Sequence, residues 1–197
     1  MDEAIQQQTT SPKKRKIHRD YDSITEEEFI KIIEYIHSKK VLVACLLAYG
    51  SGMRIQEILN LEPDDIRGNI ITIRQGKGGK DRKTNKPQGF KEEYRKLLPL
   101  KDKITKMGIQ KSFHKATMDS KINKIIFTYK TKGGKERNKY RLHFHCLRHS
   151  FATRAIEKGV PINQVQLLLG HSNVSTTSKY IRANPIDAIQ NIIDKGV

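Results

Sequence analysis

Apolar residues recur at helical spacing along most of this 197-residue chain. Large apolar side chains stand three or four positions apart in several separate stretches, which is typical of amphipathic helices. This spacing predicts helices over residues 23–36, 40–49, 53–61, 145–158, 161–169 and 185–195. A capping box of Ser23 with Glu26, or of Thr25 with Glu28, fits the start of the first helix. Gly50-Ser51-Gly52 ends the second, and Pro63 stops the third.

Other segments have different patterns. Residues 69–75 are rich in β-branched side chains and predict a strand, a glycine-rich turn follows at 76–79, and 80–86 returns as a very polar, exposed edge strand. We also predict a basic amphipathic helix at 91–107, a helix at 108–124, a further helix leading to residue 180, a short strand or buried loop at 125–129 and a loop at 130–139. The predicted fold class is mainly α (α+β), a helical domain with one small antiparallel β-sheet.

Positive charge is concentrated in the middle of the chain. The formal net charge is +17, and the stretch from Arg74 to Arg141 holds 22 basic and 6 acidic residues, a net of +16. A basic surface of this size indicates a polyanionic partner, and nucleic acid is the commonest one. A generic basic surface is the alternative interpretation.

The ends of the chain and its cysteines restrict the classes of protein to which it can belong. Residues 1–20 are polar, carry the basic cluster at 12–16 and predict a disordered arm or linker, or else a nuclear localisation signal. Two cysteines make no disulfide framework, and Cys45 lies in an apolar run typical of a core. No apolar run approaches the roughly 20 residues that a membrane span needs, so we expect no membrane partner.

Residues suited to phosphodiester chemistry are scattered along the chain. Attack on a DNA phosphate needs cationic donors, a nucleophile and an acid for the leaving 5′ oxygen. Arginine suits the first task because its planar fork matches two phosphate oxygens. Each residue alone has a simpler interpretation, since Arg54 can pair with Glu57 and a single tyrosine is most often packed. The candidates, in chain order, are Arg54, Lys77, His145, Arg148, His171 and Tyr180.

The order and the sequences of these segments resemble the motifs of the tyrosine recombinase (phage integrase, Xer-like) family. Gly52-Met53-Arg54-Ile55-Gln56-Glu57 resembles its first arginine box, and Gly76-Lys77-Gly78-Gly79-Lys80-Asp81-Arg82 its hairpin lysine. His145-Cys146-Leu147-Arg148-His149 is similar to the HxLRH box, and Leu169-Gly170-His171 with Tyr180 to the LGH…Y box. The resemblance spans about residues 22–184.

The resemblance implies a role for each residue. Tyr180 attacks the phosphorus and forms a 3′-phosphotyrosyl link, while Arg54 and Arg148 hold the non-bridging oxygens. His171 donates a further hydrogen bond, His145 assists proton movement at the tyrosine, and Lys77 protonates the leaving hydroxyl. No metal, nucleotide or other cofactor is implied. Lys80, Arg82 and Lys83 are expected to contact DNA, and after Arg82 the sequence departs from the family's usual Val-Pro-Leu run, so Lys80 or Lys83 competes with Lys77 for the acid role.

The expected organisation is a catalytic domain at 21–197, with the family's N-terminal core-binding domain absent from this chain. Double-stranded DNA is the expected partner, bound by a homodimer or homotetramer, with no small-molecule substrate. The expected location is cytoplasmic and DNA-associated, and nuclear only in a eukaryotic host. The tail 185–197 either docks on a neighbouring protomer or packs in cis.

Three rival hypotheses stay open. A zinc site can be drawn from four neighbouring residues, although ligands bunched this closely are unusual; these are His143, His145, Cys146 and His149. A type IB topoisomerase uses the same tyrosine chemistry to relax supercoils. A non-catalytic DNA-binding relative is the third.

Overall fold

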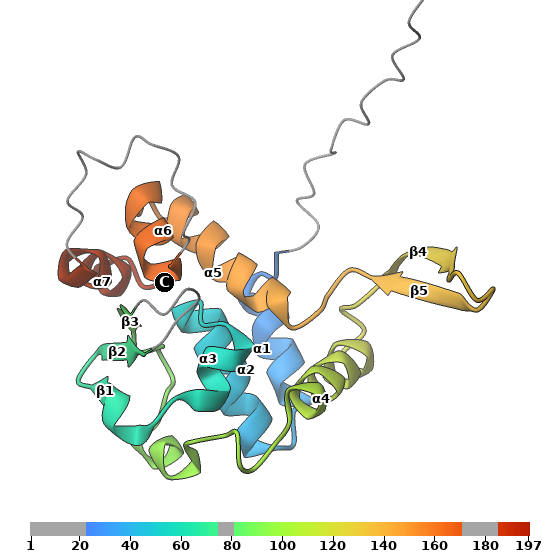
Figure 1. Cartoon of the computed structure of the whole chain (residues 1–197). Coiled ribbons are helices and arrows are strands. Elements are labelled where there is room, and N and C mark those ends of the chain that lie inside the picture. Colours follow the sequence, from blue (N-terminus) through green and yellow to red (C-terminus); the bar gives the residue numbers. More distant parts are fainter. Residues whose placement is uncertain (1–22, 75–80, 171–184) are drawn as a thin grey trace, which may run out of the picture.

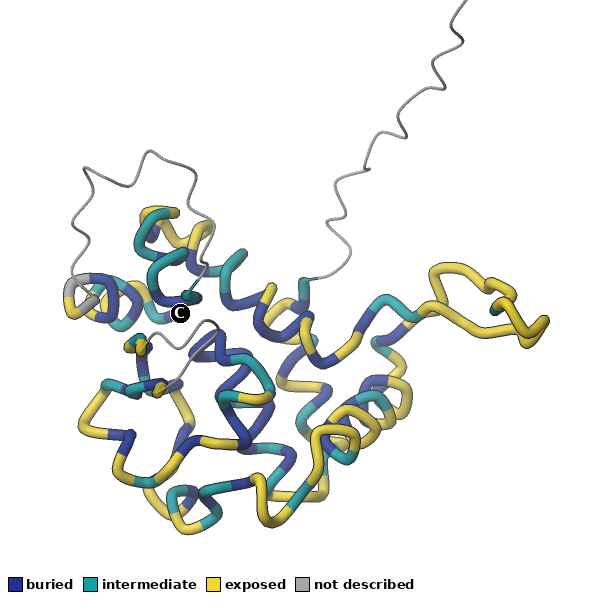
Figure 2. Tube along the Cα trace, in the orientation of Figure 1, coloured by how far each residue is buried: buried dark blue, intermediate teal, exposed yellow. Residues whose placement is uncertain are grey.

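Helix α2 (Lys39–Ser51) lies at the centre of the computed structural model, which describes residues 23–74, 81–170 and 185–197. Most of its side chains are buried, and Val41, Cys45 and Leu47 are completely inaccessible. An apolar helix of this kind must be enclosed by its neighbours. Helices α3 (Ile55–Asn60), α4 (Lys106–Asp119) and α5 (His145–Glu157) pack around it. Figure 2 shows the resulting line of buried residues through the body of the molecule.

Helix α1 (Glu26–Glu34) confirms one of the two predicted capping boxes. The Thr25 hydroxyl accepts the Glu28 N–H at 3.2 Å, and the Glu28 carboxylate accepts the Thr25 N–H at 3.2 Å. Phe29 then stacks on Tyr49 of α2 with ring centroids 3.8 Å apart. The cap therefore sets the start of the helix, and the ring pair attaches it to the core.

A second cluster of buried side chains joins α5, α6 (Ile162–Leu169) and α7 (Pro185–Asp194). Phe151, Leu168 and Ile192 lie in it, each no more than 1% exposed. Helix α7 packs on α6 and on strand β3 of its own chain. The tail of this single chain thus packs in cis, and docking on a neighbouring protomer stays a prediction.

The predicted hairpin at 69–86 is confirmed as antiparallel strands β2 (Ile70–Ile73) and β3 (Arg82–Asn85), and a short strand β1 (Ile66–Arg67) adds to β2. Strand β3 is an edge strand as expected, but the prediction that it is exposed was wrong at its end. Thr84 and Asn85 are 0% and 2% exposed, because their side chains donate to the carbonyls of Ser51 and Gly50 at 2.9 and 2.7 Å. Polar residues are buried here because they satisfy the carbonyls at the end of α2.

Two further predictions were wrong. In place of a helix over 91–107 there is a six-residue 3-10 helix, η3 (Glu92–Leu97), and Leu98 is extended. Pro99 follows Leu98, and a residue before proline disfavours the helical region. The expected loop at 130–139 contains strand β5 (Glu136–Tyr140), which pairs with β4 (Ile125–Lys130) in a second antiparallel sheet. The helix expected at 108–124 is α4, capped by the Thr105 side chain.

The 3-10 helix η2 (Pro63–Asp65) links α3 to β1. Within the described ranges, no helix is both long and apolar enough to span a bilayer. The predicted arm at 1–20 and the helix expected before residue 180 lie outside the described residues.

Candidate active site

Arg54 lies where α2 ends and α3 begins. Gly52 closes α2 in the left-handed conformation, with φ of 61°, and a Cβ there would lie 2.6 Å from Phe151 and 2.7 Å from Leu169. Only glycine meets both conditions easily. Glu57 then accepts the Arg54 backbone N–H at 2.7 Å and its Nη1 at 2.8 Å. The guanidinium of Arg54 is therefore held over the first turn of α3.

Arg148 comes from the first turn of α5 and is almost fully buried, at 4% exposed. Its Nη1 donates to the Gly52 carbonyl at 2.5 Å and its Nη2 to the Leu169 carbonyl at 2.6 Å. Burial, and then the positive charges of Arg54 and Arg82, lower the pKa of Arg148 to about 9. The side chain thus ties the ends of two helices to one point.

Arg82, the first residue of β3, lies at the same point. Its Nη2 forms an ion pair with Glu57 at 2.6 Å, and its Nη1 donates to the Leu168 carbonyl. The side chain is 8% exposed, and burial lowers the pKa of Arg82 against the opposing pull of Glu57. We expected Arg82 to contact DNA. In the structure its Nη1 and Nη2 bond groups inside the protein, and its DNA contact stays a prediction. The neighbouring Lys83 is exposed, and its DNA contact stays a prediction.

Three arginines therefore bond three successive carbonyls at the end of α6. Arg82 takes Leu168, Arg148 takes Leu169, and Arg54 takes Gly170 at 3.1 Å. The last carbonyls of a helix have no partner inside it and carry the negative end of its dipole. Segments separated by up to 116 residues in the sequence are joined in this way.

Glu57 is the one carboxylate bonded to this arginine cluster in the part of the chain that the structure describes. Its side chain is 7% exposed, and burial alone would raise its pKa. The charge of Arg82 and hydrogen bonds from Arg54 and Arg82 outweigh burial and hold the pKa of Glu57 below its ordinary value. It is therefore ionised at neutral pH and offsets part of the arginine charge.

His145 opens α5 beside Arg148. Both line a cavity of about 200 Å³ with Met53, Ile55, Lys106, Gln110 and Phe144. Desolvation, and then the charges of His149 and Arg148, lower the pKa of His145 to about 4. Its ring is therefore neutral at pH 7 and can accept a proton.

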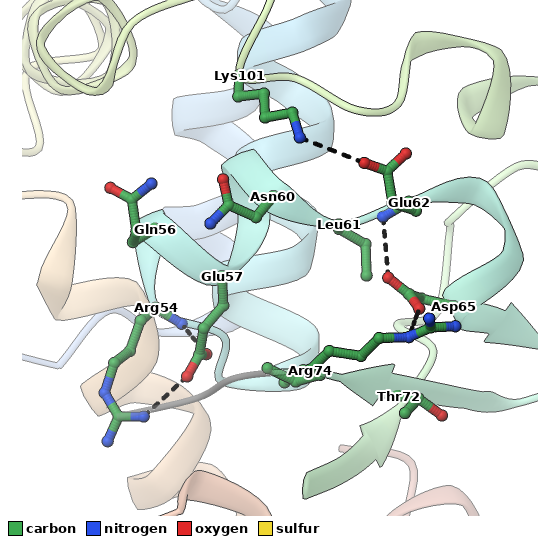
Figure 3. Close-up of a pocket in the computed structure, with 11 residues that line it drawn as sticks. Arg54, Gln56, Glu57, Asn60, Leu61, Glu62, Asp65, Thr72, Arg74 and Lys101 are labelled. Carbon is green, nitrogen blue, oxygen red and sulfur yellow. Dashed lines mark hydrogen bonds and ion pairs between the residues drawn. The ribbon is translucent and has the colours of Figure 1, made fainter. Parts of the chain in front are cut away.

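A larger cavity, of about 600 Å³, is lined by Arg54 and by residues of α3, η2 and β2 (Figure 3). Its charges are paired with one another, since Arg54 bonds Glu57, Arg74 bonds Asp65 at 2.8 Å, and Lys101 lies 3.5 Å from a Glu62 oxygen. These three pairs leave no net charge in the wall of the cavity.

The four residues of the rival zinc site are not grouped around one point. Cys146 is completely buried and contacts His143, while the rings of His145 and His149 meet edge to face at 4.9 Å. In the described ranges, no group of three or more His, Cys, Asp or Glu side chains is placed to hold a metal ion.

The model of the phage integrase family matches residues 22–186. The chain belongs to the phage integrase family. The tyrosine recombinase XerA of Pyrococcus furiosus is 37% identical over 167 residues, which cover 81% of this chain and 57% of that protein. The chain thus spans little more than half the length of this curated relative.

Solved structures of the family have the same fold. The catalytic domain of bacteriophage HP1 integrase matches with a TM-score of 0.52 and 19% identity, over 89% of this chain and 98% of that one. A XerH site-specific recombinase bound to a palindromic difH substrate, in a post-cleavage complex, matches with a TM-score of 0.57 and 22% identity, over 77% of this chain and 46% of that one. The predicted fold class is confirmed.

Three of the six residues that the integrase resemblance singled out lie close together in the structure, namely Arg54, His145 and Arg148. The other three, Lys77, His171 and Tyr180, lie outside the described residues, as does Lys80. The sequence offered Glu57 only as a simple partner of Arg54, and its spacing of three residues was the available signal. Nothing in the sequence pointed to the inward bonds of Arg82.

Proposed function

We propose that this chain is the catalytic portion of a site-specific recombinase, which cuts and rejoins DNA through a covalent bond to Tyr180. The observation that carries the proposal is the meeting of Arg54 and Arg148 beside a neutral His145. The family match, which extends past Tyr180, supports the assignment of the nucleophile. We assign residues 21–197 to this catalytic domain.

The proposed reaction keeps the bond energy in the protein. The Tyr180 oxygen attacks the phosphorus, the bond from phosphorus to the 5′ oxygen breaks, and Lys77 gives its proton to that oxygen. A tyrosine has a pKa near 10, so it needs a base or cationic neighbours at neutral pH, and His145 is proposed to assist proton movement at Tyr180. Arg54 and Arg148, with His171, stabilise the charge that gathers on the phosphate oxygens. The reverse attack by a 5′ hydroxyl rejoins the strand and needs no cofactor.

Double-stranded DNA is the proposed partner, and a pair or a tetramer of protomers the proposed assembly. The solved XerH complex contains a palindromic substrate. A palindrome presents the same half-site twice, which matches two protomers related by a two-fold axis. DNA association is accordingly the proposed location, in the cytoplasm or, in a eukaryotic host, the nucleus.

Trapping the covalent intermediate tests the proposal. The substrate is a pool of duplexes of randomised sequence with a nick near the cleavage position. Cleavage releases a short fragment that diffuses away, so the strand cannot be rejoined and the protein stays covalently attached. The adduct is seen as a gel band that resists detergent. We expect an adduct with the wild type and none with Tyr180→Phe, although the variant keeps its non-covalent DNA binding. An adduct of undiminished yield with Tyr180→Phe contradicts the assignment of the nucleophile.

A second assay separates the recombinase from a type IB topoisomerase. The DNA captured in the first assay supplies two duplexes of different length that carry the same site. A recombinase joins strands from different duplexes, whereas a topoisomerase reseals each one. Hybrid-length products therefore support the proposal. Duplexes resealed only at their own lengths, with relaxation of a supercoiled plasmid that carries the same site, favour the alternative.

A further inference from the structure

The β4–β5 hairpin stands out from the body of the molecule (Figures 1 and 2). Every residue of β4 is exposed, and β5 is exposed up to its last residue, Tyr140. Four large apolar side chains of β4 are 43–53% exposed. An isolated two-stranded hairpin is marginally stable in water, and exposed apolar side chains often mark a binding surface. We therefore expect this hairpin to bind a partner.

The root of the hairpin is firmly held. The side-chain oxygen of Asn123 accepts the Leu142 N–H at 2.8 Å, and its amide donates to the Leu142 carbonyl at 3.1 Å. Arg141 bonds both carboxylate oxygens of Glu28, at 2.8 and 3.0 Å, and the Ser23 carbonyl at 2.9 Å. The arm is therefore an exposed extension on a fixed base, and its last strand ends five residues before His145.

The register divides the hairpin into two faces. Phe127 pairs with Lys139 and Tyr129 with Arg137, and directly opposed residues project from the same face. The two rings lie 6.1 Å apart on this face, which thus alternates aromatic and cationic side chains. The opposite face carries the hydrogen-bonded pair of Thr128 and Asn138, 2.8 Å apart.

Charge identifies the kind of partner. Residues 125–140 contain five basic residues and one acidic residue, a net of +4. Among the residues that the structure describes, no carboxylate lies within ion-pair distance of these five side chains; they are Lys130, Lys132, Lys135, Arg137 and Lys139. Cations without a partner, next to exposed aromatic rings, are the pattern of a nucleic-acid surface.

We propose that the β4–β5 hairpin is a second DNA-binding surface, which grips the duplex beside the catalytic centre. Its cations contact the phosphates, and Phe127 and Tyr129 lie against the sugar edges of the groove. Six residues of strand reach about 20 Å, and duplex DNA presents about a dozen phosphates over that length. This inference rests on the proposed function, since it takes DNA to be the substrate.

The salt dependence of DNA binding tests the proposal. The full chain is titrated with a labelled duplex of mixed sequence, about four helical turns long, at about 50–200 mM salt. The hairpin variant K132Q/K135Q/R137Q/K139Q is compared with K31Q/K39Q/K96Q/K195Q, which removes four exposed cations from other elements. We expect the slope of log affinity against log salt to fall by about 3 to 4 for the hairpin variant, and by less than about 1 for the control.

A second variant isolates the aromatic face. F127S/Y129S keeps every charge, so we expect affinity to fall by about tenfold at each salt concentration, with an unchanged slope. We expect both variants to stay folded, because the hairpin lies outside the two buried clusters. Circular dichroism checks this.

The outcomes separate this inference from the proposed function. If the wild type shows no salt-dependent binding to duplex DNA, both fail. If the wild type binds and the slopes of the hairpin and control variants fall equally, the hairpin proposal alone is overturned. It is also overturned if the hairpin variant keeps wild-type DNA affinity but reduces the mass of the protein–DNA complex, since the arm then docks on protein.

Discussion

Replacing Glu57 by glutamine removes the carboxylate that lies between two guanidinium groups. Glu57 and Arg82 are 7% and 8% exposed at their side chains, so their ion pair at 2.6 Å has little solvent screening. The Arg54 side chain is 26% exposed and contributes less. Removing one partner of a buried pair costs about 3–5 kcal/mol, because the other charge is left uncompensated. Since glutamine keeps one acceptor oxygen, we expect Glu57→Gln to lower the free energy of unfolding by about 3 kcal/mol.

Urea unfolding measures this change. With a slope of about 2 kcal/mol per molar, a loss of about 3 kcal/mol moves the midpoint down by about 1.5 M. The matched control is Asp119→Asn, which breaks the pair of Lys115 and Asp119, whose side chains are 77% and 41% exposed. A surface pair of this kind contributes about 0.5 kcal/mol or less. Equal losses in the two variants would refute the argument that burial makes the Glu57 ion pair strong.

The contribution of Glu57 to stability also depends on pH. The folded pKa of Glu57 lies below its ordinary value of 4.5. Its stabilisation is therefore complete above the unfolded pKa and is lost as pH falls through the folded one. We expect the difference in stability between wild type and Glu57→Gln to stay constant from neutral pH down to about 5 and to shrink in stronger acid.

Two further predictions concern the same site. His145 should titrate near pH 4 by NMR, instead of near 6.5, and His145→Gln assigns the resonance. Because the folded pKa is the lower one, this residue lowers the free energy of unfolding as pH falls from 6.5 towards 4. A titration midpoint at 6.5 or above contradicts the prediction. Gly52→Ala should destabilise by about 1–3 kcal/mol more than Gly68→Ala in urea unfolding, because both have positive φ but only the first Cβ meets Phe151 and Leu169; equal losses would contradict it.

Most helices could be predicted from the sequence because their causes are local. The spacing of apolar residues and the caps lie within a few positions of one another, as in Thr25 with Glu28. The errors fall where that condition fails. Strand β5 has a polar sequence without apolar alternation, and it is a strand because its backbone pairs with β4. The buried end of β3 depends likewise on bonds to α2, which lies more than 30 residues away.

The candidate site divides in the same way. Resemblance indicated Arg54, His145 and Arg148, because the family's boxes are short and local. It placed Arg82 with the DNA contacts, which stays a prediction, and did not indicate its bonds to Glu57 and Leu168. The bond from Arg82 to Leu168 spans 86 residues, and no pattern within the hairpin encodes it.

The arginine cluster also contributes to two unusual pKa values, those of Arg148 and His145. Arg54, Arg82 and Arg148 bring three positive charges to the end of α6, and the helix carbonyls supply only partial negative charge. Glu57 balances one of the three. Burial is the first cause of the lowered pKa of both residues. The charges of Arg54 and Arg82 come next for Arg148, whereas those of His149 and then Arg148 come next for His145. A phosphate brought to this point would reduce that excess, so the charge that lowers the pKa of Arg148 in the free chain is the same charge that favours DNA.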